Sequence, residues 1–229
     1  MPAQPTSAAE LAKFIDHTLL KPEATRAQID RLCREALEYD FAAVCVNPFW
    51  VEECVSQLQN SSVQVATVAG FPLGASLPEI KAAEAKRAVQ QGASEVDMVV
   101  NLGALIAGDK TLVQEDIWQV VAATRQASES AIVKVILETA ALSDEQIILG
   151  CRCAAEAQAA YVKTSTGFHP AGGATVEHVA LLHKHASPIK VKASGGIRDL
   201  QSVRAMIEAG ASRLGMSAGI AVMQELAAQ

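Results

Sequence analysis

Short β-prone runs alternate with longer, alanine- and glutamate-rich stretches along the whole chain, and this alternation restricts the fold more than any other feature. Strands that alternate with helices predict a parallel sheet, because each parallel connection needs a crossover of a dozen or more residues. The β-prone runs are KFIDHTLL, AAVCVNP, VQVATVAGF, SEVDMVVNL, AIVKVILET, AYVKTSTGF, IKVKASGG and SRLGMSAG.

Eight strand–helix units in 229 residues predict a closed (β/α)8 barrel, the TIM-barrel architecture of the α/β class. We expect this barrel to form a single domain that spans residues 1–229. A doubly wound open sheet is the structural alternative. Its usual marker, a GxGxxG turn after the first strand, does not occur, since DHTLLKPE stands at that place.

Several helical stretches begin with a capping signature. In a capping box, a Ser or Thr side chain accepts a hydrogen bond from the backbone three residues later, where a Glu or Gln side chain bonds back. The pairs that match this pattern are Thr25 with Gln28, Ser76 with Glu79, and Ser143 with Gln146.

Composition and charge argue against several functional classes. The net charge of −6 does not suit a nucleic-acid partner, which requires a basic face. No apolar run reaches membrane-spanning length, and the first ten residues lack the apolar segment of a secretory signal, so we expect a cytoplasmic protein. The five cysteines fit neither a disulfide framework nor a zinc site, and we expect no metal and no cofactor.

Period-two alternation sorts the strand residues into two faces, and polar residues gather on the face that would point into the barrel. In SEVDMVVNL, Asp97 shares a face with Glu95, whereas the opposite face is apolar and suits packing under helices. In the first run, Asp16 and Thr18 lie opposite Ile15. These polar residues are therefore candidates for a site inside the barrel.

Three lysines, Lys134, Lys163 and Lys192, fall on the inner faces of three successive predicted strands. Neighbouring strands lie about 4.8 Å apart, so ammonium groups at that spacing must pair with carboxylates or lose a proton. For a single strand lysine, a structural ion pair is the simpler interpretation. For the whole set we favour catalysis, because buried ion pairs seldom stabilise a core more than apolar packing does.

A lysine amine is a nucleophile only without its proton, and its usual pKa of about 10.4 lies far above neutral pH. A second ammonium group on a neighbouring strand lowers that pKa, and burial lowers it further. Such a pair suits Schiff-base chemistry, in which one lysine attacks a carbonyl while the other and Asp97 move protons. These residues by themselves leave open which of Lys134, Lys163 and Lys192 is the nucleophile.

Glycine-rich turns follow the last three predicted strands, namely STG at 165–167, SGGIR at 194–198 and MSAG at 216–219. Barrel enzymes often bind phosphate at backbone N–H groups in the loops after strands seven and eight. Three such turns at neighbouring strand ends predict a phosphorylated substrate.

The motifs DHTLL, VCVNP, EVDMVVNLGAL, KVILET, YVKTSTGF, VKASGGIR and GMSAG occur in this order between Asp16 and Gly219. Together they resemble the deoxyribose-phosphate aldolases. The resemblance implies a metal-independent class I aldolase on a (β/α)8 barrel, which cleaves 2-deoxy-D-ribose 5-phosphate reversibly to D-glyceraldehyde 3-phosphate and acetaldehyde. The implied partners are a small sugar phosphate and an aldehyde, and the sequence is compatible with a homo-oligomer.

The resemblance also implies roles for individual residues. Lys163 would form the Schiff base, and Asp97 and Lys192 would be the proton-relay pair. The implied sugar contacts are Asp16, Thr18, Cys45 and Lys134, and the implied phosphate contacts are Thr166, Gly167, Gly195, Gly196 and Ser217.

Two features depart from the family's pattern. Met216 and Ala218 stand in the last turn where hydroxyl residues are common, so we expect one phosphate contact to be missing. The tail AVMQELAAQ lacks the terminal tyrosine of some members, so we expect no help from the tail in proton transfer.

The sequence leaves three other functions open. One is a transaldolase-like Schiff-base enzyme acting on a related sugar phosphate. The second is a sugar-phosphate isomerase that works without an imine, and the third is a barrel that binds a sugar phosphate as a sensor. Trapping with borohydride separates the first from the other two, because only an imine is reduced onto lysine.

Overall fold

The structure is a computed structural model that describes residues 4–228. Its eight strands are parallel, each pairs with the next in the sequence, and β8 pairs with β1 to close a barrel. The predicted (β/α)8 barrel is therefore confirmed, and the alternative of an open sheet is wrong. The strands are β1 (Ile15–Leu19), β2 (Ala43–Val46), β3 (Gln64–Ala69), β4 (Glu95–Val99), β5 (Ile132–Ile136), β6 (Tyr161–Lys163), β7 (Lys190–Ser194) and β8 (Arg213–Met216).

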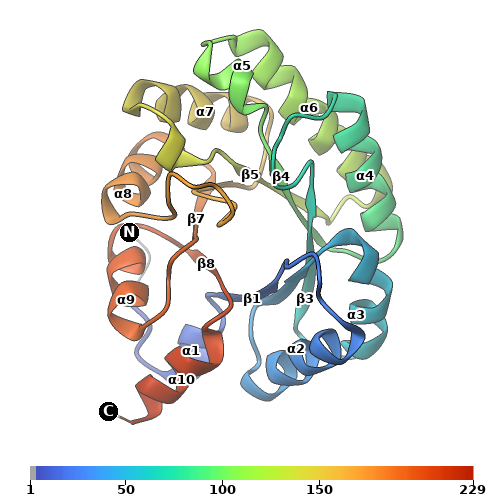
Figure 1. The fold of residues 1–229 in the computed structure, drawn as a ribbon, viewed down its shortest axis with the longest axis vertical. Helices are drawn as coiled ribbons and strands as arrows, with labels where there is room; N and C mark the ends of the chain where they lie inside the picture. Colours follow the sequence, from blue (N-terminus) through green and yellow to red (C-terminus); the bar gives the residue numbers. More distant parts are fainter. Residues whose placement is uncertain (1–3, 229) are drawn as a thin grey trace.

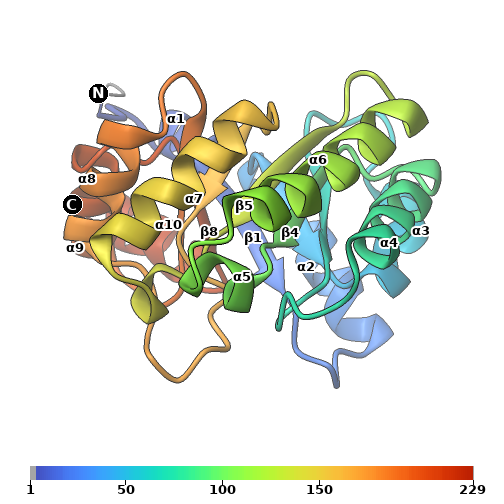
Figure 2. The same cartoon turned by 90° about the horizontal axis from the view of Figure 1, so that it is seen from above.

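Helices surround the strands on the outside of the barrel, as Figures 1 and 2 show. They are α1 (Ala8–Ala12), α2 (Arg26–Tyr39), α3 (Val51–Gln57), α4 (Pro78–Gln90), α5 (Leu102–Ile106), α6 (Lys110–Ala127), α7 (Asp144–Glu156), α8 (Val176–His185), α9 (Leu200–Glu208) and α10 (Gly219–Ala227), with the 3-10 turns η1 (Pro48–Trp50) and η2 (Thr139–Ala141). This arrangement buries the outer face of the strands under helices and leaves the two ends of the barrel for loops.

Two of the three predicted capping boxes form. Thr25 and Ser143 are the N-caps of α2 and α7, and each is bonded reciprocally with the glutamine three residues later. The capping box predicted at Ser76 is wrong, because α4 begins at Pro78 and its N-cap is Leu77. Proline lacks an N–H and has a φ close to the helical value, so it takes the first helical position and leaves Ser76 one residue too early.

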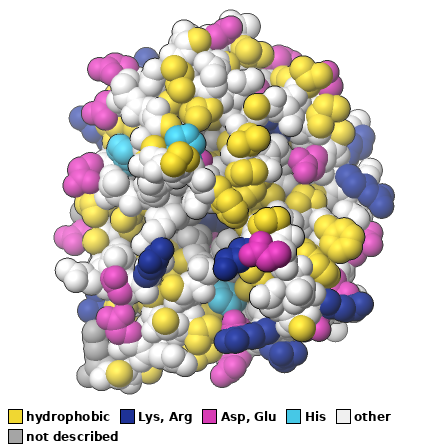
Figure 3. Space-filling model, viewed as in Figure 1, with side chains coloured by type: hydrophobic (Ala, Val, Ile, Leu, Met, Phe, Trp, Pro, Cys, Tyr) yellow, Lys and Arg dark blue, Asp and Glu magenta, His cyan; other side chains and the backbone are white. Residues whose placement is uncertain are grey.

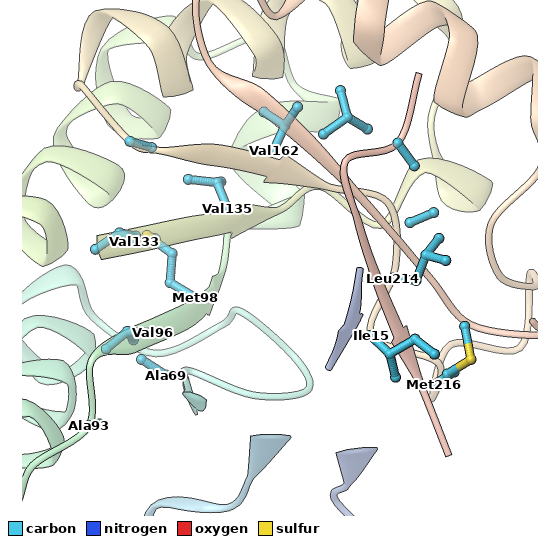
Figure 4. Close-up of a cluster of buried hydrophobic side chains, with 14 of the residues drawn as sticks. Ile15, Ala69, Ala93, Val96, Met98, Val133, Val135, Val162, Leu214 and Met216 are labelled. Carbon is cyan, nitrogen blue, oxygen red and sulfur yellow. The ribbon is translucent and has the colours of Figure 1, made fainter. Parts of the chain in front are cut away.

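Apolar side chains cover the outer faces of the strands. Val96 and Met98 of β4 are buried in the large hydrophobic cluster together with Val133 and Val135 of β5 and Val162 of β6 (Figure 4). A fully buried side chain of this kind stabilises the fold by roughly 1.5–3 kcal/mol. Because the outer positions are apolar, the polar residues that alternate with them face the interior of the barrel, as predicted.

A buried ion pair outside the barrel holds the end of β4. Lys81 Nζ of α4 lies 2.8 Å from Asp116 Oδ2 of α6 and donates to the Val99 carbonyl at 2.9 Å. The same Asp116 oxygen accepts a hydrogen bond from the Asn101 N–H at 2.8 Å. Both charged side chains are fully buried, so these contacts fix the carboxyl end of the strand that carries Asp97.

Candidate active site

The parallel register brings polar residues of neighbouring strands together inside the barrel. Lys163 of β6 lies opposite Lys192 of β7, and Asp97 of β4 lies opposite Lys134 of β5. Because the inner face of each strand carries every second residue, these four side chains point toward the same interior space.

Asp97 lies at the centre of the three inner lysines. Lys163 Nζ and Lys192 Nζ donate to the same oxygen, Asp97 Oδ2, at 2.7 and 2.8 Å. Lys134 Nζ donates to the other oxygen, Oδ1, at 2.8 Å. Lys163 is 3% exposed and the other three side chains are fully buried. The Asp97 carboxylate therefore accepts hydrogen bonds from three lysines, and these lysines are close enough to influence one another's protonation.

A second set of charged contacts extends the site toward the other end of the barrel. Glu95 Oε2 forms an ion pair with Lys134 Nζ at 2.5 Å, and Glu95 Oε1 accepts a hydrogen bond from Arg213 Nη2 at 2.8 Å. Arg213 Nη1 also donates to Asp16 Oδ1 at 2.5 Å. The other oxygen of Asp16 accepts a hydrogen bond from Lys192. Lys134, Lys192 and Arg213 thus each contact two or more carboxylates.

Among residues 4–228, Lys163 has one carboxylate partner, Asp97, whereas Lys134 and Lys192 each have two or more. The pKa values of the three lysines reflect this difference. Burial lowers the pKa of the Lys163 amine, Asp97 opposes this effect, and the charge of Lys192 adds to it, so that the pKa falls below its usual value. Burial also disfavours the charged forms of Lys134 and Lys192, but their carboxylate partners outweigh burial and raise both pKa values. For Asp97, the three lysines outweigh burial and hold the pKa well below its usual range.

Lys163 also differs from the other two lysines in its access to ligands. A cavity of about 430 Å³ opens at the carboxyl ends of β1, β6, β7 and β8, and Lys163 belongs to its lining. Lys134 and Lys192 are fully buried outside this lining. Figure 3 shows a face of the molecule that is hollowed near its centre, with Lys or Arg side chains beside the hollow. Of the three lysines, Lys163 is therefore the one that can meet a ligand in the cavity.

Glycines shape the SGGIR turn, which borders the cavity. Gly195 and Gly196 have φ values of +89° and +83°, which glycine adopts without strain. A Cβ at Gly195 would lie 3.0 Å from the Gly173 Cα, so a side chain there would force the turns apart. A Cβ at Gly196 would meet no described atom within 4 Å, which shows that this turn faces open space. The backbone at Gly196 is thus open to the cavity that this residue lines.

Glu138 holds the STG turn after β6. Its carboxylate accepts the Thr166 N–H at 3.2 Å and the Thr166 hydroxyl at 2.5 Å. Glu138 is itself buried and has a φ of +61°. Thr166 lines the cavity, but both of its hydrogen-bond donors are engaged within the protein.

The site residues expected from the sequence lie at two levels. Those that line the cavity are Thr18, Lys163, Thr166, Gly167, Gly195, Gly196 and Ser217. Those that are fully buried outside the lining are Asp16, Cys45, Asp97, Lys134 and Lys192. Cys45 packs in a small apolar cluster inside the barrel with Ala43 and Val68. A ligand in the cavity thus meets Lys163 before it can meet any residue of the second group.

Three cations of the site escaped the sequence-based search. Lys21 and Arg198 line the cavity; Lys21 directly follows the DHTLL motif, and Arg198 is the last residue of SGGIR. Arg213 shares the inner face of β8 with Gly215, so the period-two sorting used for the other strands would have found it. A Cβ at Gly215 would lie 3.1 Å from Lys192 Cε, and glycine therefore leaves room for that buried lysine.

The described part of the chain, residues 4–228, shows no group of three or more His, Cys, Asp or Glu side chains arranged to hold a metal ion. The carboxylates of the site contact lysine and arginine instead. Within the same residues, no helix combines the length and apolar character needed to cross a membrane.

A comparison with protein families decides the relationship that the motifs suggested. The model for "DeoC/LacD family aldolase" matches residues 11–225. The chain belongs to this family of aldolases. The resemblance inferred from the motifs is therefore confirmed.

Two similar curated proteins are both named deoxyribose-phosphate aldolase. The deoxyribose-phosphate aldolase of Brevibacillus brevis is 55% identical over 212 residues, which cover 92% of this chain and 94% of the relative. The enzyme of the same name from a Geobacillus species is 54% identical over 215 residues, with 93% and 95% covered.

Solved structures agree with this family membership. A putative deoxyribose-phosphate aldolase from Coccidioides immitis superposes with a TM-score of 0.92 at 46% identity, covering 99% of this chain and 88% of that one. The deoxyribose phosphate aldolase of Aeropyrum pernix, described as tetrameric, has a TM-score of 0.89 at 33% identity and covers 96% and 92%.

Proposed function

We propose that this family member, acting as one domain over residues 1–229, cleaves 2-deoxy-D-ribose 5-phosphate reversibly to D-glyceraldehyde 3-phosphate and acetaldehyde. The reaction proceeds through a Schiff base on Lys163. One observation carries this assignment: of the three lysines around Asp97, Lys163 is the one that lines the cavity, and its pKa is lowered. The amine that a substrate reaches is thus also the amine that most readily becomes a nucleophile.

In the proposed reaction, the uncharged Lys163 Nζ attacks C1 of the open-chain sugar, and loss of water gives a protonated imine. The electrons of the C2–C3 bond then move toward the imine nitrogen as that bond breaks. The C3 hydroxyl gives up its proton and becomes the aldehyde of glyceraldehyde 3-phosphate. The enamine that remains takes a proton on C2, and hydrolysis releases acetaldehyde and restores the Lys163 amine.

Asp97 and Lys192 are proposed to move the protons that these steps require. Asp97 Oδ2 lies 2.7 Å from Lys163 Nζ and is shared with Lys192, so a proton can pass between the amine and this pair. General acid–base catalysis by positioned groups contributes roughly 10²–10⁴-fold to a rate. Asp16 and Lys134 hold the pair in place, since Asp16 bonds Lys192 and Lys134 bonds Asp97.

The phosphate of the substrate is proposed to bind in the turns after β6, β7 and β8, with the sugar near Thr18. Gly167, Gly195, Gly196 and Ser217 line this end of the cavity, and their backbone N–H groups are the proposed donors to the phosphate. Hydrogen bonds to a charged group contribute roughly 1.5–3 kcal/mol each. The exposed cations Lys21 and Arg198 line the same cavity and supply the positive charge that a dianion requires.

Product analysis tests the proposed function. Incubation with deoxyribose 5-phosphate should yield acetaldehyde and glyceraldehyde 3-phosphate in equal amounts, measured with two separate coupled dehydrogenase assays. An isomerase would convert the substrate without releasing acetaldehyde, and a transaldolase-like enzyme would require a second sugar as acceptor. A sensor would bind the sugar phosphate and leave it unchanged. Any of these three outcomes would contradict the proposal.

Replacing Arg198 with methionine should weaken the preference for the phosphorylated substrate. Losing one charge-assisted contact of roughly 1.5–3 kcal/mol should lower kcat/KM for deoxyribose 5-phosphate by about 10- to 100-fold, with little change for deoxyribose. Steady-state kinetics with both substrates measures the ratio. Lys184→Met, on the exposed surface of α8, is a matched control that removes one cation away from the cavity. An equal loss for both substrates would show that Arg198 does not recognise phosphate.

A further inference from the structure

The charged cluster inside the barrel holds more cations than carboxylates. Its cations are Lys134, Lys163, Lys192 and Arg213, and its carboxylates are Asp16, Glu95 and Asp97. The most exposed of these seven side chains, that of Arg213, is 12% exposed. With every group ionised, four positive charges face three negative ones. Such an excess in a poorly solvated interior favours the loss of one proton from a cation.

The contacts indicate which cation loses the proton. The guanidinium of Arg213 stays protonated in proteins, and it bridges Asp16 and Glu95 at 2.5 and 2.8 Å. Lys134 and Lys192 each contact two or more carboxylates. Lys163 contacts Asp97 through an oxygen that it shares with Lys192. Lys163 is therefore the cation that loses its proton.

We infer that Arg213 is a positioning residue for Schiff-base formation, which keeps the Lys163 amine uncharged by occupying Asp16 and Glu95 from the far side of the cluster. Without the guanidinium, the remaining three cations and three carboxylates would balance, and Lys163 would keep its proton. This inference rests on the proposed role of Lys163 as the nucleophile, and it assigns a function to a residue that does not touch the substrate.

The pairing of β6, β7 and β8 gives the size of the effect of Arg213 on the pKa of Lys163. Arg213 lies opposite Lys192, which lies opposite Lys163, so the two ends of this row are two strands or about 10 Å apart. A unit charge at that distance, at an effective dielectric near 20, shifts a pKa by about one unit. The other titratable groups that face Lys163 or Arg213 stay unchanged in the variants below; they are Cys45 of β2, Tyr161 of β6, and Lys21 and Arg198 at the cavity.

The pH dependence of kcat/KM for cleavage of deoxyribose 5-phosphate tests the inference, because this profile reports the ionisation of the free enzyme. Arg213→Met should move the acidic limb upward by about one pH unit, since the Lys163 amine becomes harder to deprotonate. Glu95→Gln should move the acidic limb downward by a similar amount, because this change removes a negative charge from the cluster. Arg213→Lys should leave the limb near its wild-type position, because it keeps the charge.

The double variant Arg213→Met/Glu95→Gln restores the excess of one positive charge and should return the limb toward wild type. A packing defect could not shift the two single variants in opposite directions, so that pattern separates charge balance from damage to the fold. If Arg213→Met does not fold, the downward shift of the acidic limb in Glu95→Gln still tests the inference. Shifts of the same sign in both single variants, or a Glu95→Gln profile that coincides with wild type, would overturn the inference. Borohydride trapping of acetaldehyde on wild-type Lys163 is a separate experiment, and its failure would refute the proposed function instead.

Discussion

The variant Lys163→Met is expected to lose aldolase activity by roughly 10⁴-fold or more, because neither of the other two lysines around Asp97 lines the cavity and a methionine cannot form an imine. Methionine has a similar length and flexibility, so the packing around it should persist. Asp97 keeps two charged partners, Lys134 and Lys192, and is not left as an unpaired buried charge. The loss should therefore appear in kcat, while the fold remains intact by circular dichroism.

Release of acetaldehyde from deoxyribose 5-phosphate measures this effect. Lys190→Met is the matched control, since Lys190 lies on β7 but is exposed at the opposite end of the barrel from the cavity. Its activity should remain close to that of wild type. Residual activity of Lys163→Met within about 100-fold of wild type would mean that another amine forms the imine or that no imine is needed.

The variant Lys192→Leu is expected to lose roughly 10³-fold in kcat/KM at neutral pH and to recover part of that loss at higher pH. Two ammonium groups about 5 Å apart, at an effective dielectric near 20, interact by roughly 3 kcal/mol, or about two pKa units. Removing the charge of Lys192 should therefore raise the pKa of Lys163, so that less of the amine is free at pH 7. Loss of the proton relay with Asp97 adds a further factor of about ten or more that higher pH does not restore.

A pH profile from 6 to about 10 separates the two contributions of Lys192, because the charge effect moves the acidic limb and the relay effect lowers the plateau. Asp16 remains paired with Arg213 in this variant, which limits the damage to the fold. Lys190→Leu, two residues earlier on the same strand, controls for the loss of a β7 lysine. Activity of Lys192→Leu within a few-fold of wild type at pH 7 would refute the mechanism that depends on paired lysines.

Much of this architecture could be predicted from the sequence because two periodicities are strong in it. The alternation of strands and helices gives the barrel, and the period-two pattern places Asp97, Lys134, Lys163 and Lys192 on inner faces. Each of these is a local property of the chain, so it does not depend on how the barrel closes. The wrong capping box at Ser76 has the same kind of cause, since the pattern ignored the stronger preference of Pro78 for the first helical position.

Other features depend on contacts between strands that are distant in the sequence, and the sequence did not reveal them. Which lysine reaches the cavity depends on the level of each residue along the barrel axis, and this level follows from the stagger of the strands. Arg213 and Asp16 are 197 positions apart in the chain yet share an ion pair where β8 meets β1. The engagement of both Thr166 donors by Glu138 likewise follows from the left-handed conformation of Glu138, which no local pattern indicated.

The site also illustrates why a buried charged cluster persists in a stable barrel. Replacing such ion pairs with apolar residues of similar volume is often neutral or stabilising. The interior of this barrel nevertheless holds lysine, arginine and carboxylate side chains where valine or leucine would pack well. Such a cluster is understandable if it serves chemistry, because burial and the charge of Lys192 together lower the pKa of Lys163 against the opposing charge of Asp97.

Mass-spectrometric mapping after borohydride reduction tests the central assignment most directly. The wild-type protein should be incubated with acetaldehyde, reduced, digested and mapped, with Lys163→Met treated in parallel. The account predicts that the two-carbon adduct lies on Lys163, in the peptide that contains YVKTSTGF, and that the variant gains none at this position. An adduct on Lys134 or Lys192, or no adduct from an enzyme that cleaves deoxyribose 5-phosphate, would contradict it.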